Sequence, residues 1–414
     1  MTEHRDDEEW AKAEDAKDPL ARFRGEFLFP QGPGRRPSLY FAGHSLGLQP
    51  RRARELVLQE LDEWARLGVE AHFAGRSPWM SYHELLTGPT ARLVGALPHE
   101  VVVMNTLSVN LHLLMVSFYR PKPGRTRILI EAGAFPSDRY AVESQARFHG
   151  HDPCEAVIEA RGCDEVLRVI REQGDSIALV LIGNVNYLTG EAFDIPAIVR
   201  AGHAQGCMVG FDLAHGAGNL ELQLHDWGPD FAAWCSYKYL NGGPGTLGGV
   251  FIHDRHAQAE LPRFAGWWGH DKSTRFKMGP DFHPIYGAEG WQLSNPPILQ
   301  LAVLRASMEL FDAAGMSALR AKSVRLTGYL ESILDSIDRV QLLTPREPGR
   351  RGTMLTLRIK GDAKALVGKL QDAGAICDLR APDILRLAPA PLYTRFADVH
   401  RLGRLLREAL NAGA

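Results

Sequence analysis

The sequence predicts an α/β protein with a large, mostly parallel sheet sandwiched by helices and a smaller α+β domain at the C-terminus. From residue 79 onward, amphipathic segments of helix length alternate with short apolar runs. The runs are apolar throughout, as expected of strands buried on both faces. Beyond residue 353 the order changes to strand, helix, strand, strand and helix, which is typical of a small sheet packed against helices.

The expected elements follow one another in a regular order. Strands of the large sheet are predicted over residues 101–105, 127–131, 156–160, 176–186, 207–215, 231–237 and 247–253. Helices are predicted over 79–97, 110–119, 137–150, 163–174, 194–206, 299–313 and 317–337. The C-terminal part is expected to form strands 353–359, 375–380 and 384–389 with helices 363–374 and 396–413. We therefore divide the chain into an N-terminal segment and arm (1–50), a large domain (51–310) and a small domain (311–414).

The composition favours a small-molecule partner over nucleic acid or a membrane. The chain has 47 basic and 49 acidic residues, a net charge of -2, and no basic block. Its acidic start is unlike a signal peptide and is consistent with a disordered tail or with an arm that crosses a dimer. No apolar stretch is long enough to span a membrane. The five cysteines never show CxxC spacing, so we expect no disulfide framework, no metal and a cytoplasmic protein.

Two predicted strands are followed by residues suited to a phosphate and to a flat ligand. In open parallel sheets, ligands collect at the carboxyl ends of the strands. After the first strand, Thr106 or Ser108 can cap a helix whose free amides would hold a phosphate, although a plain N-cap is the commoner meaning of this pattern. After the second strand, Phe135 and Asp138 follow in "FPSD", where the ring can stack on a flat ligand or belong to the core.

Two further strand ends carry an acid and an amine. Asp212 ends a buried strand, with His215 on the next turn, and a carboxylate in that place needs a partner. A protonated pyridine nitrogen would provide one, and a turn aspartate with a capping role is the alternative. Lys238 follows the next strand, where partly apolar surroundings would free its amine for a Schiff base, and a surface lysine at a loop start is the alternative.

Together these strand ends match what pyridoxal phosphate requires of its protein. Tyr237, next to Lys238, can donate to the phosphate or relay a proton, and "NGGPG" at 241–245 lets the backbone pass close to a ligand. The chain lacks both G-x-x-x-x-G-K-[ST] and G-x-G-x-x-G in a first βα unit, which argues against nucleotide cofactors. We therefore expect pyridoxal 5'-phosphate as the cofactor.

Several longer motifs resemble those of the kynureninase family. They are "YFAGHSLGLQP" (40–50), "FPSD" (135–138), "GFDLAHGAGN" (210–219), "DFAAWCSYKYLNGGPG" (230–245), "GWWGHDKSTRFKM" (266–278) and "SNPPIL" (294–299), within a likeness from about residue 39 to residue 400. The resemblance implies a fold-type-I pyridoxal phosphate enzyme that is a homodimer. It also implies hydrolysis of kynurenine or 3-hydroxykynurenine to anthranilate or 3-hydroxyanthranilate plus alanine, in tryptophan catabolism.

The resemblance assigns roles to residues around the cofactor. Lys238 matches the lysine that forms the Schiff base, Asp212 the partner of the pyridine nitrogen, and Phe135 the ring that stacks on the cofactor. Tyr237 is a further cofactor contact and our candidate proton donor. The other cofactor contacts implied are Leu107, Ser108, Pro136, Ser137, Asp138, Gly183 and His215.

Other matching positions belong to the substrate side and to the neighbouring subunit. Arg386 matches the arginine that forks onto the substrate carboxylate, while Ser45 and His72 match positions beside the substrate's aromatic ring. Trp267 and Asn295 match positions that the family supplies from the neighbouring subunit. Because His72 together with Asn295 is associated with the 3-hydroxy substrate, we form the hypothesis that 3-hydroxykynurenine is preferred.

Two positions depart from the family's usual pattern. His44 stands where the family usually has the asparagine of "GNSLG", and Gly183 falls where a serine or threonine often contacts the cofactor. The rival predictions are another enzyme of the same fold, such as a cysteine desulfurase or aminotransferase, and a ligand-binding protein without turnover. A desulfurase needs a mobile nucleophilic cysteine, and Cys377, the cysteine nearest to that description, lies in an expected strand.

Overall fold

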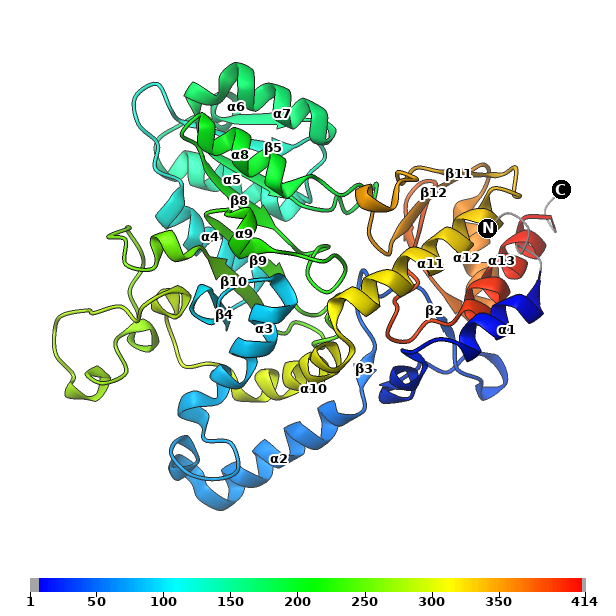
Figure 1. Ribbon diagram of the computed structural model, residues 1–414, viewed down its shortest axis with the longest axis horizontal. Helices are drawn as coiled ribbons and strands as arrows, with labels where there is room; N and C mark the ends of the chain where they lie inside the picture. The colour runs from blue at the N-terminus through cyan, green and yellow to red at the C-terminus, as the bar shows by residue number, and fades with distance from the viewer. Residues whose placement is uncertain (1–6, 412–414) are drawn as a thin grey trace.

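The computed structural model describes residues 7–411, which form two bodies joined by long helices (Figure 1). The larger body contains a seven-stranded sheet and the smaller one a four-stranded sheet. The predicted α/β fold with a smaller α+β part is thereby confirmed. The predicted boundaries after residues 50 and 310 fall at the end of β3 (Gln49–Pro50) and inside α10 (Ile298–Ala314), and the division into domains stays a prediction.

The large sheet is parallel except for one strand. Its order is β4-β10-β9-β8-β7-β5-β6, and β10 runs antiparallel to both of its neighbours. The strands are apolar along their length because both faces are covered: in β7, Val180 and Ile182 belong to one core, while Leu179 and Leu181 belong to the other. The strands are β4 (Val101–Met104), β5 (Arg127–Glu131), β6 (Val157–Ala160), β7 (Ile177–Gly183), β8 (Met208–Asp212), β9 (Phe231–Cys235) and β10 (Gly248–Ile252).

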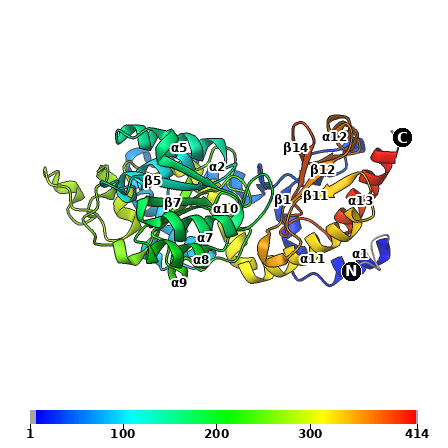
Figure 2. The same cartoon turned by 90° about the horizontal axis from the view of Figure 1, so that it is seen from above.

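Helices cover both faces of the large sheet (Figure 2). α4 and α5 share one core with the strands, and α3, α7, α8 and α10 share the other. Because helices connect the parallel strands, the carboxyl ends of those strands gather at one edge of the sheet. The bounds are α2 (Arg52–Leu67), α3 (Thr87–Val94), α4 (Leu107–Phe118), α5 (Pro136–Phe148), α6 (Pro153–Ala156), α7 (Gly162–Gln173), α8 (Ile195–Ala204) and α9 (Leu224–Trp227).

The smaller body is an antiparallel sheet of order β11-β12-β15-β14 packed against helices. The first helix, α1, belongs to it: the Trp10 ring lies 4.7 Å from Tyr329 and 5.9 Å from Phe396. Part of the acidic start is therefore a packed helix, and residues 1–6 lie outside the described residues. The bounds are α1 (Glu8–Ala16), α11 (Met316–Leu334), α12 (Ala363–Asp372), α13 (Phe396–Asn411), β11 (Val340–Leu342), β12 (Leu355–Ile359), β14 (Asp378–Arg380) and β15 (Ile384–Leu387).

The helix predicted over 79–97 is shorter than expected. Its first half is a 3-10 segment, Trp79–Leu86, and α3 begins only at Thr87. The reason is Pro89, which has no amide to donate to residue 85 and therefore fits the first turn of a helix but not the interior of a longer one.

The strand predicted over 375–380 is two strands with different partners. β13 (Ala375–Ile376) pairs in parallel with β2 (Leu39–Tyr40), while β14 pairs with β15. The pairing of β13 with β2 ties the N-terminal segment to the smaller body. The same segment contains a second short pair, β1 (Phe27–Leu28) with β3, and β3 leads into α2.

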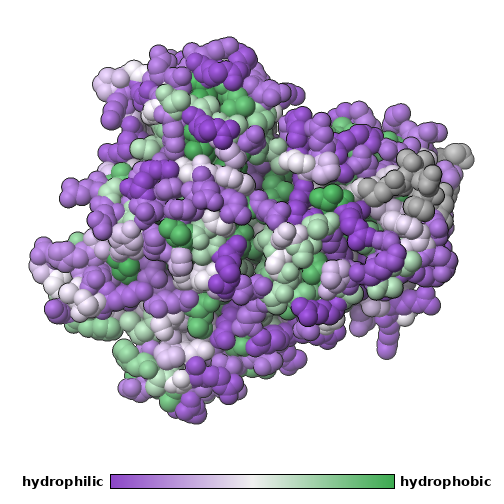
Figure 3. Space-filling view, viewed as in Figure 1, coloured by the Kyte–Doolittle hydropathy of each residue, from purple (hydrophilic) through white to green (hydrophobic). Residues whose placement is uncertain are grey.

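The face of the molecule in Figure 3 is hydrophilic at its rim and carries apolar patches toward its middle. Among the residues that the structure describes, no helix is both long and apolar enough to cross a membrane. Scattered apolar patches of this kind are normal on folded proteins, so only a contiguous one would indicate a contact surface.

Candidate active site

A cavity opens at the carboxyl edge of the large sheet, where β5, β7, β8 and β9 end and α4 and α5 begin. The predicted site residues that line it are Leu107, Ser108, Phe135, Ser137, Asp138, Gly183, Asp212, His215, Tyr237 and Lys238. Pro136 begins α5 between two of them. Glu131, Val185, Tyr187 and Ala214 also line the cavity, and sequence reasoning missed them. The signal for Glu131 was an acid that ends a buried strand, as Asp212 does.

The N-terminal turns of α4 and α5 meet at this cavity. Ser108 Oγ and Ser137 Oγ lie 2.7 Å apart. Asn105 makes the turn from β4 into α4 in the left-handed conformation, with φ of 45°, and its carbonyl accepts a hydrogen bond from the Gly248 amide. The first amides of a helix have no partner within that helix, and here two hydroxyls lie beside them. This arrangement is suited to a phosphate.

Three buried carboxyl groups, those of Glu131, Asp138 and Asp212, share the cavity wall. Asp138 is hydrogen-bonded to Asp212, and burial together with the Asp212 charge raises the pKa of Asp138 well above its usual range. Burial raises the pKa of Glu131 to about 7, although its carboxylate accepts a hydrogen bond from the Gly183 amide. Burial and the neighbouring negative charge thus favour the protonated form of Asp138. The cluster is suited to a ligand that brings a positive charge or an N–H group.

Lys238 enters the cavity from the loop after β9. Its Nζ donates to Nε2 of His215 at 3.1 Å and lies 5.9 Å from the centroid of the Phe135 ring. Burial and the Lys238 charge lower the pKa of His215 well below its usual range, so the neutral ring accepts this hydrogen bond. The Phe135 side chain is 44% exposed and remains accessible beside the amine. An amine next to an accessible ring can hold and stack a flat aldehyde.

Close backbone contacts fix the loop that carries Lys238. A Cβ on Gly47 would lie 2.4 Å from the carbonyl oxygen of Lys238, and the Gly47 amide donates to the carbonyl of Tyr237. Asn241 adopts a φ of 51°, which closes the turn after the lysine. Gly47, the last residue of "GHSLG", therefore allows the two segments to pass close together, and their contact holds the lysine backbone in place.

Gly183 has a structural reason to differ from the pattern of serine or threonine. A Cβ at this position would lie 2.5 Å from Oε1 of Glu131, while the Gly183 amide donates to Oε2 of the same group at 2.9 Å. The Glu131 carboxyl therefore occupies the space that a larger side chain would need.

Arg386 lies just behind the cavity wall and is almost fully buried. Its Nε and Nη2 donate to Oδ1 of Asp378 at 2.8 and 2.7 Å, and its Nη1 donates to the carbonyl of Tyr187 at 2.7 Å. Tyr187 lines the cavity, and its ring packs edge-on against Phe135 at 5.2 Å. These bonds use three of the five guanidinium N–H groups, so two remain available to a carboxylate.

Four predicted residues lie outside the cavity of this chain. Trp267 and Asn295 are exposed on the segment between β10 and α10, which projects from the larger body (Figure 1). Ser45 is exposed in the loop between β2 and β3. His72 ends a 3-10 segment and packs edge-on against Trp79 at 5.4 Å. The cavity of this chain is thus lined by side chains from strand ends and helix starts, and these four residues do not contribute to it.

Known proteins match this chain over nearly its whole length. Residues 319–406 match the family model of the kynureninase C-terminal domain. The chain is 62% identical over 412 residues to the kynureninase of Myxococcus xanthus, with 97% of each covered. It is 59% identical over 405 residues to that of Koribacter versatilis, with 95% of this chain and 96% of the relative covered. The chain belongs to the kynureninase family. The predicted family is confirmed.

Solved structures share the fold of this kynureninase-family chain at much lower identity. A cysteine desulfurase from Escherichia coli superposes with a TM-score of 0.77 at 18% identity, covering 95% of this chain and 98% of its own. A mutant of the enzyme C-DES, solved with glycine covalently linked to its PLP cofactor, has a TM-score of 0.76 at 18% identity, with 92% and 98% covered. At this identity the likeness establishes the fold, and the desulfurase reaction does not follow from it.

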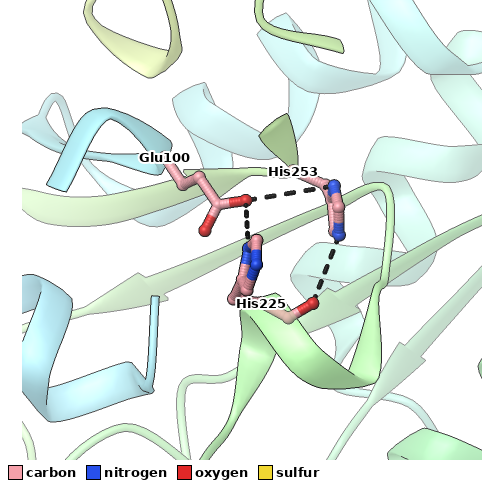
Figure 4. A group of neighbouring side chains, drawn as sticks. All are labelled: Glu100, His225 and His253. Atoms are coloured by element: carbon pink, nitrogen blue, oxygen red, sulfur yellow. Dashed lines mark hydrogen bonds and ion pairs between the residues drawn. The ribbon is translucent and has the colours of Figure 1, made fainter. Parts of the chain in front are cut away.

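A second group of titratable side chains lies outside the cavity (Figure 4). Glu100 is fully buried and accepts hydrogen bonds from two backbone amides and from Nδ1 of His225 at 3.0 Å. Nδ1 of His253, 3.9 Å from the same carboxyl oxygen, accepts from a backbone amide, and its Nε2 contacts the His225 carbonyl at 3.2 Å. Because the facing atoms already have partners, the group is a structural tie between the starts of β4 and α9 and the end of β10.

We expect the His225–Glu100 pair to stabilise the fold more in acid than in base. The hydrogen bond to Glu100 raises the pKa of His225 above 6.5. A group whose pKa rises on folding stabilises the folded state fully below its unfolded pKa and loses that contribution as the pH rises through the folded pKa. The unfolding free energy of wild type minus that of His225→Gln should therefore fall as the pH rises above about 6.5. A difference that does not change with pH would contradict this assignment.

Proposed function

We propose that this protein hydrolyses L-kynurenine or 3-hydroxy-L-kynurenine to anthranilate or 3-hydroxyanthranilate and L-alanine, with pyridoxal 5'-phosphate as cofactor. The observation that carries the proposal is the cavity shared by Lys238, Phe135 and the Asp138–Asp212 pair, in a chain that matches kynureninases throughout. A desulfurase activity is disfavoured because Cys377 is buried, and burial raises the pKa of its thiol to about 12.

The residues of the cavity fit the cofactor group by group. The first turns of α4 and α5, with Ser108 and Ser137, offer amide and hydroxyl donors to a phosphate. Asp212, with Asp138 hydrogen-bonded to it, offers an acceptor to a protonated ring nitrogen. Lys238 offers the amine that would bind the aldehyde carbon. When bound, pyridoxal phosphate supplies an electron sink for the negative charge that develops on the substrate.

The protein contributes proton transfer and orientation. The free amine of Lys238 would be the base that removes the α-proton of the substrate. Asp212 keeps the ring nitrogen protonated. Tyr237 remains protonated because burial and the neighbouring Cys235 raise the pKa of its hydroxyl group, and it donates a proton in the later steps. Arg386 directs its two free N–H groups to the substrate carboxylate. Water adds to the side-chain carbonyl carbon Cγ, the bond between Cβ and Cγ breaks, and Cβ takes up a proton.

We also propose a homodimer whose subunits complete each other's sites. Exposed aromatic side chains support it: Phe276 lies 6.1 Å from Phe73 and 5.5 Å from Trp267 between ring centroids, and all three are exposed. An apolar groove along β3, α2 and the Gly243–Pro244 turn adds further surface of this kind. A second subunit would cover both and receive Trp267 and Asn295. A cytoplasmic location and a role in tryptophan catabolism belong to the same proposal.

Lys238→Ala should abolish the release of anthranilate from kynurenine, measured by fluorescence of the product. The variant should also lose the visible absorbance of covalently held cofactor, because Lys238 is the one lysine among the described residues that line the cavity. Lys364→Ala, an exposed lysine on α12, serves as the control and should keep both signals. Turnover by the Lys238 variant would refute the role of this residue.

We expect 3-hydroxykynurenine to have the higher kcat/KM of the two substrates. The expectation follows from His72 and Asn295, which would contact the added hydroxyl group beside the aromatic ring of the substrate. The ratio of the two kcat/KM values, measured on one preparation, checks it. A clear preference for the unhydroxylated substrate would contradict the assignment of these two residues.

Mixed dimers test whether Asn295 acts across the interface. Lys238→Ala and Asn295→Ala proteins should each be inactive or strongly impaired. In a mixed dimer, one site combines wild-type Lys238 from one subunit with wild-type Asn295 from the other, so co-expression in equal amounts should restore about a quarter of wild-type activity. Mixtures that stay as inactive as their components would show that Asn295 serves its own subunit or neither.

A further inference from the structure

His44 is fixed at the seam between the two bodies. It lies in the loop between β2 and β3, two residues after Ala42, which pairs with Ala388 of the smaller body. A Cβ on the neighbouring Gly43 would lie 2.3 Å from the hydroxyl oxygen of Tyr393, so this end of the loop packs directly on the smaller body. Three residues later, Gly47 packs on the Lys238 loop. The ring of His44, held between these contacts, is 1% exposed.

Neither ring nitrogen of His44 has a hydrogen-bond partner among residues 7–411. Buried polar groups without partners are costly and rare in native proteins. The hydroxyl of Tyr239, which is buried and feels the charge of Arg386, likewise lacks a partner within the described chain. Arg386 adds the two N–H groups that Asp378 and the Tyr187 carbonyl leave free. Unpaired groups gathered around one guanidinium indicate a polar ligand that joins them.

The surrounding charges identify this ligand as an anion. Positive charge acts on His44 from Arg386 on β15, from Lys238 after β9 and from Arg380 on β14. Asp378 is the acid that contacts both arginines. Burial and the three cations lower the pKa of His44 well below its usual range, so the ring is neutral and carries one N–H donor. Arg386 is buried, while Arg380 and Lys238 are partly exposed. Three positive charges near one carboxylate, that of Asp378, favour the binding of a second negative charge.

We propose that His44 is a ligand of the substrate's α-carboxylate and donates a ring N–H to it alongside Arg386. The inference rests on the proposed function, because the anion is the carboxylate of the amino acid whose amine reaches Lys238. His44 reaches the group from the loop between β2 and β3, while Arg386 reaches it from β15, so two segments far apart in the sequence bind the same carboxylate. The asparagine of "GNSLG" also carries an N–H donor, which explains why histidine can replace it here.

Two substitutions separate hydrogen bonding from shape. His44→Phe keeps a ring but removes the donor, whereas His44→Asn keeps a donor in a smaller side chain. The holoenzyme is titrated with L-alanine, the product that carries the carboxylate, and with ethylamine, the same amine without it, and cofactor absorbance reports binding. His83→Phe is the control, because His83 is also buried and its ring nitrogens also lack a hydrogen bond, although Nε2 lies 3.6 Å from Oε1 of Glu289. It lies in the Trp79–Leu86 segment, outside the cavity.

We expect His44→Phe to weaken L-alanine binding about tenfold or more, while its affinity for ethylamine changes less than about twofold. His44→Asn should retain most of the wild-type affinity for L-alanine. KM for kynurenine should rise in His44→Phe by more than kcat falls. His83→Phe should leave the ratio of the two affinities unchanged. Equal weakening of both ligands, or undiminished L-alanine binding in His44→Phe, would overturn the proposal.

A double substitution tests whether His44 and Arg386 bind one group. If they do, His44→Phe should weaken L-alanine binding much less in an Arg386→Lys background than in wild type, and independent effects would overturn the shared carboxylate. Failure of the proposed function is visible separately. Wild-type protein would then release no anthranilate from kynurenine, whereas failure of this inference leaves that release intact.

Discussion

The crowding of buried carboxyl groups at the edge of the large sheet constrains the rest of the site. Glu131 and Asp212 end parallel strands and Asp138 lies in the first turn of α5, so the fold brings together three groups whose charged forms burial opposes. The hydrogen bond between Asp138 and Asp212 relieves part of this repulsion. A ligand with a protonated ring nitrogen would relieve more of this repulsion. Cofactor binding is therefore favoured by the negative charge of the carboxyl groups, which the protein alone compensates poorly.

The topology then separates three chemical tasks along one cavity. The parallel register of β5, β7, β8 and β9 brings the acids and the Lys238 loop to the same edge although they are far apart in sequence. The smaller body adds Arg386, oriented by Asp378 and by the carbonyl of Tyr187. The acids lie where a ring nitrogen would bind, the amine where an aldehyde would react, and the guanidinium where a carboxylate would be held.

Residues at strand ends could be predicted because buried strands are apolar throughout and their first polar residue marks the sheet edge. That rule found Asp212 and Lys238, and applied to β5 it also finds Glu131. The contact of Arg386 with Tyr187 depends on how the smaller body packs against the larger, and its contact with Asp378 depends on the pairing of β14 with β15. No local pattern encodes either contact. The split of the strand at 375–380 has the same origin, since β13 pairs with a segment more than 300 residues earlier. The predicted role of Trp267 and Asn295, contact with the site of the neighbouring subunit, requires a dimer and stays a prediction.

The most direct test of this account compares the binding of pyridoxal phosphate with that of its deaza analogue, in which carbon replaces the ring nitrogen. Dissociation constants are measured for the cofactor-free wild type, for Asp212→Asn and, as a control outside the proposed contact, for Glu131→Gln. The account predicts that wild type and Glu131→Gln bind the natural cofactor more tightly than the analogue and that Asp212→Asn removes the difference. Equal affinity of the wild type for both molecules would contradict it.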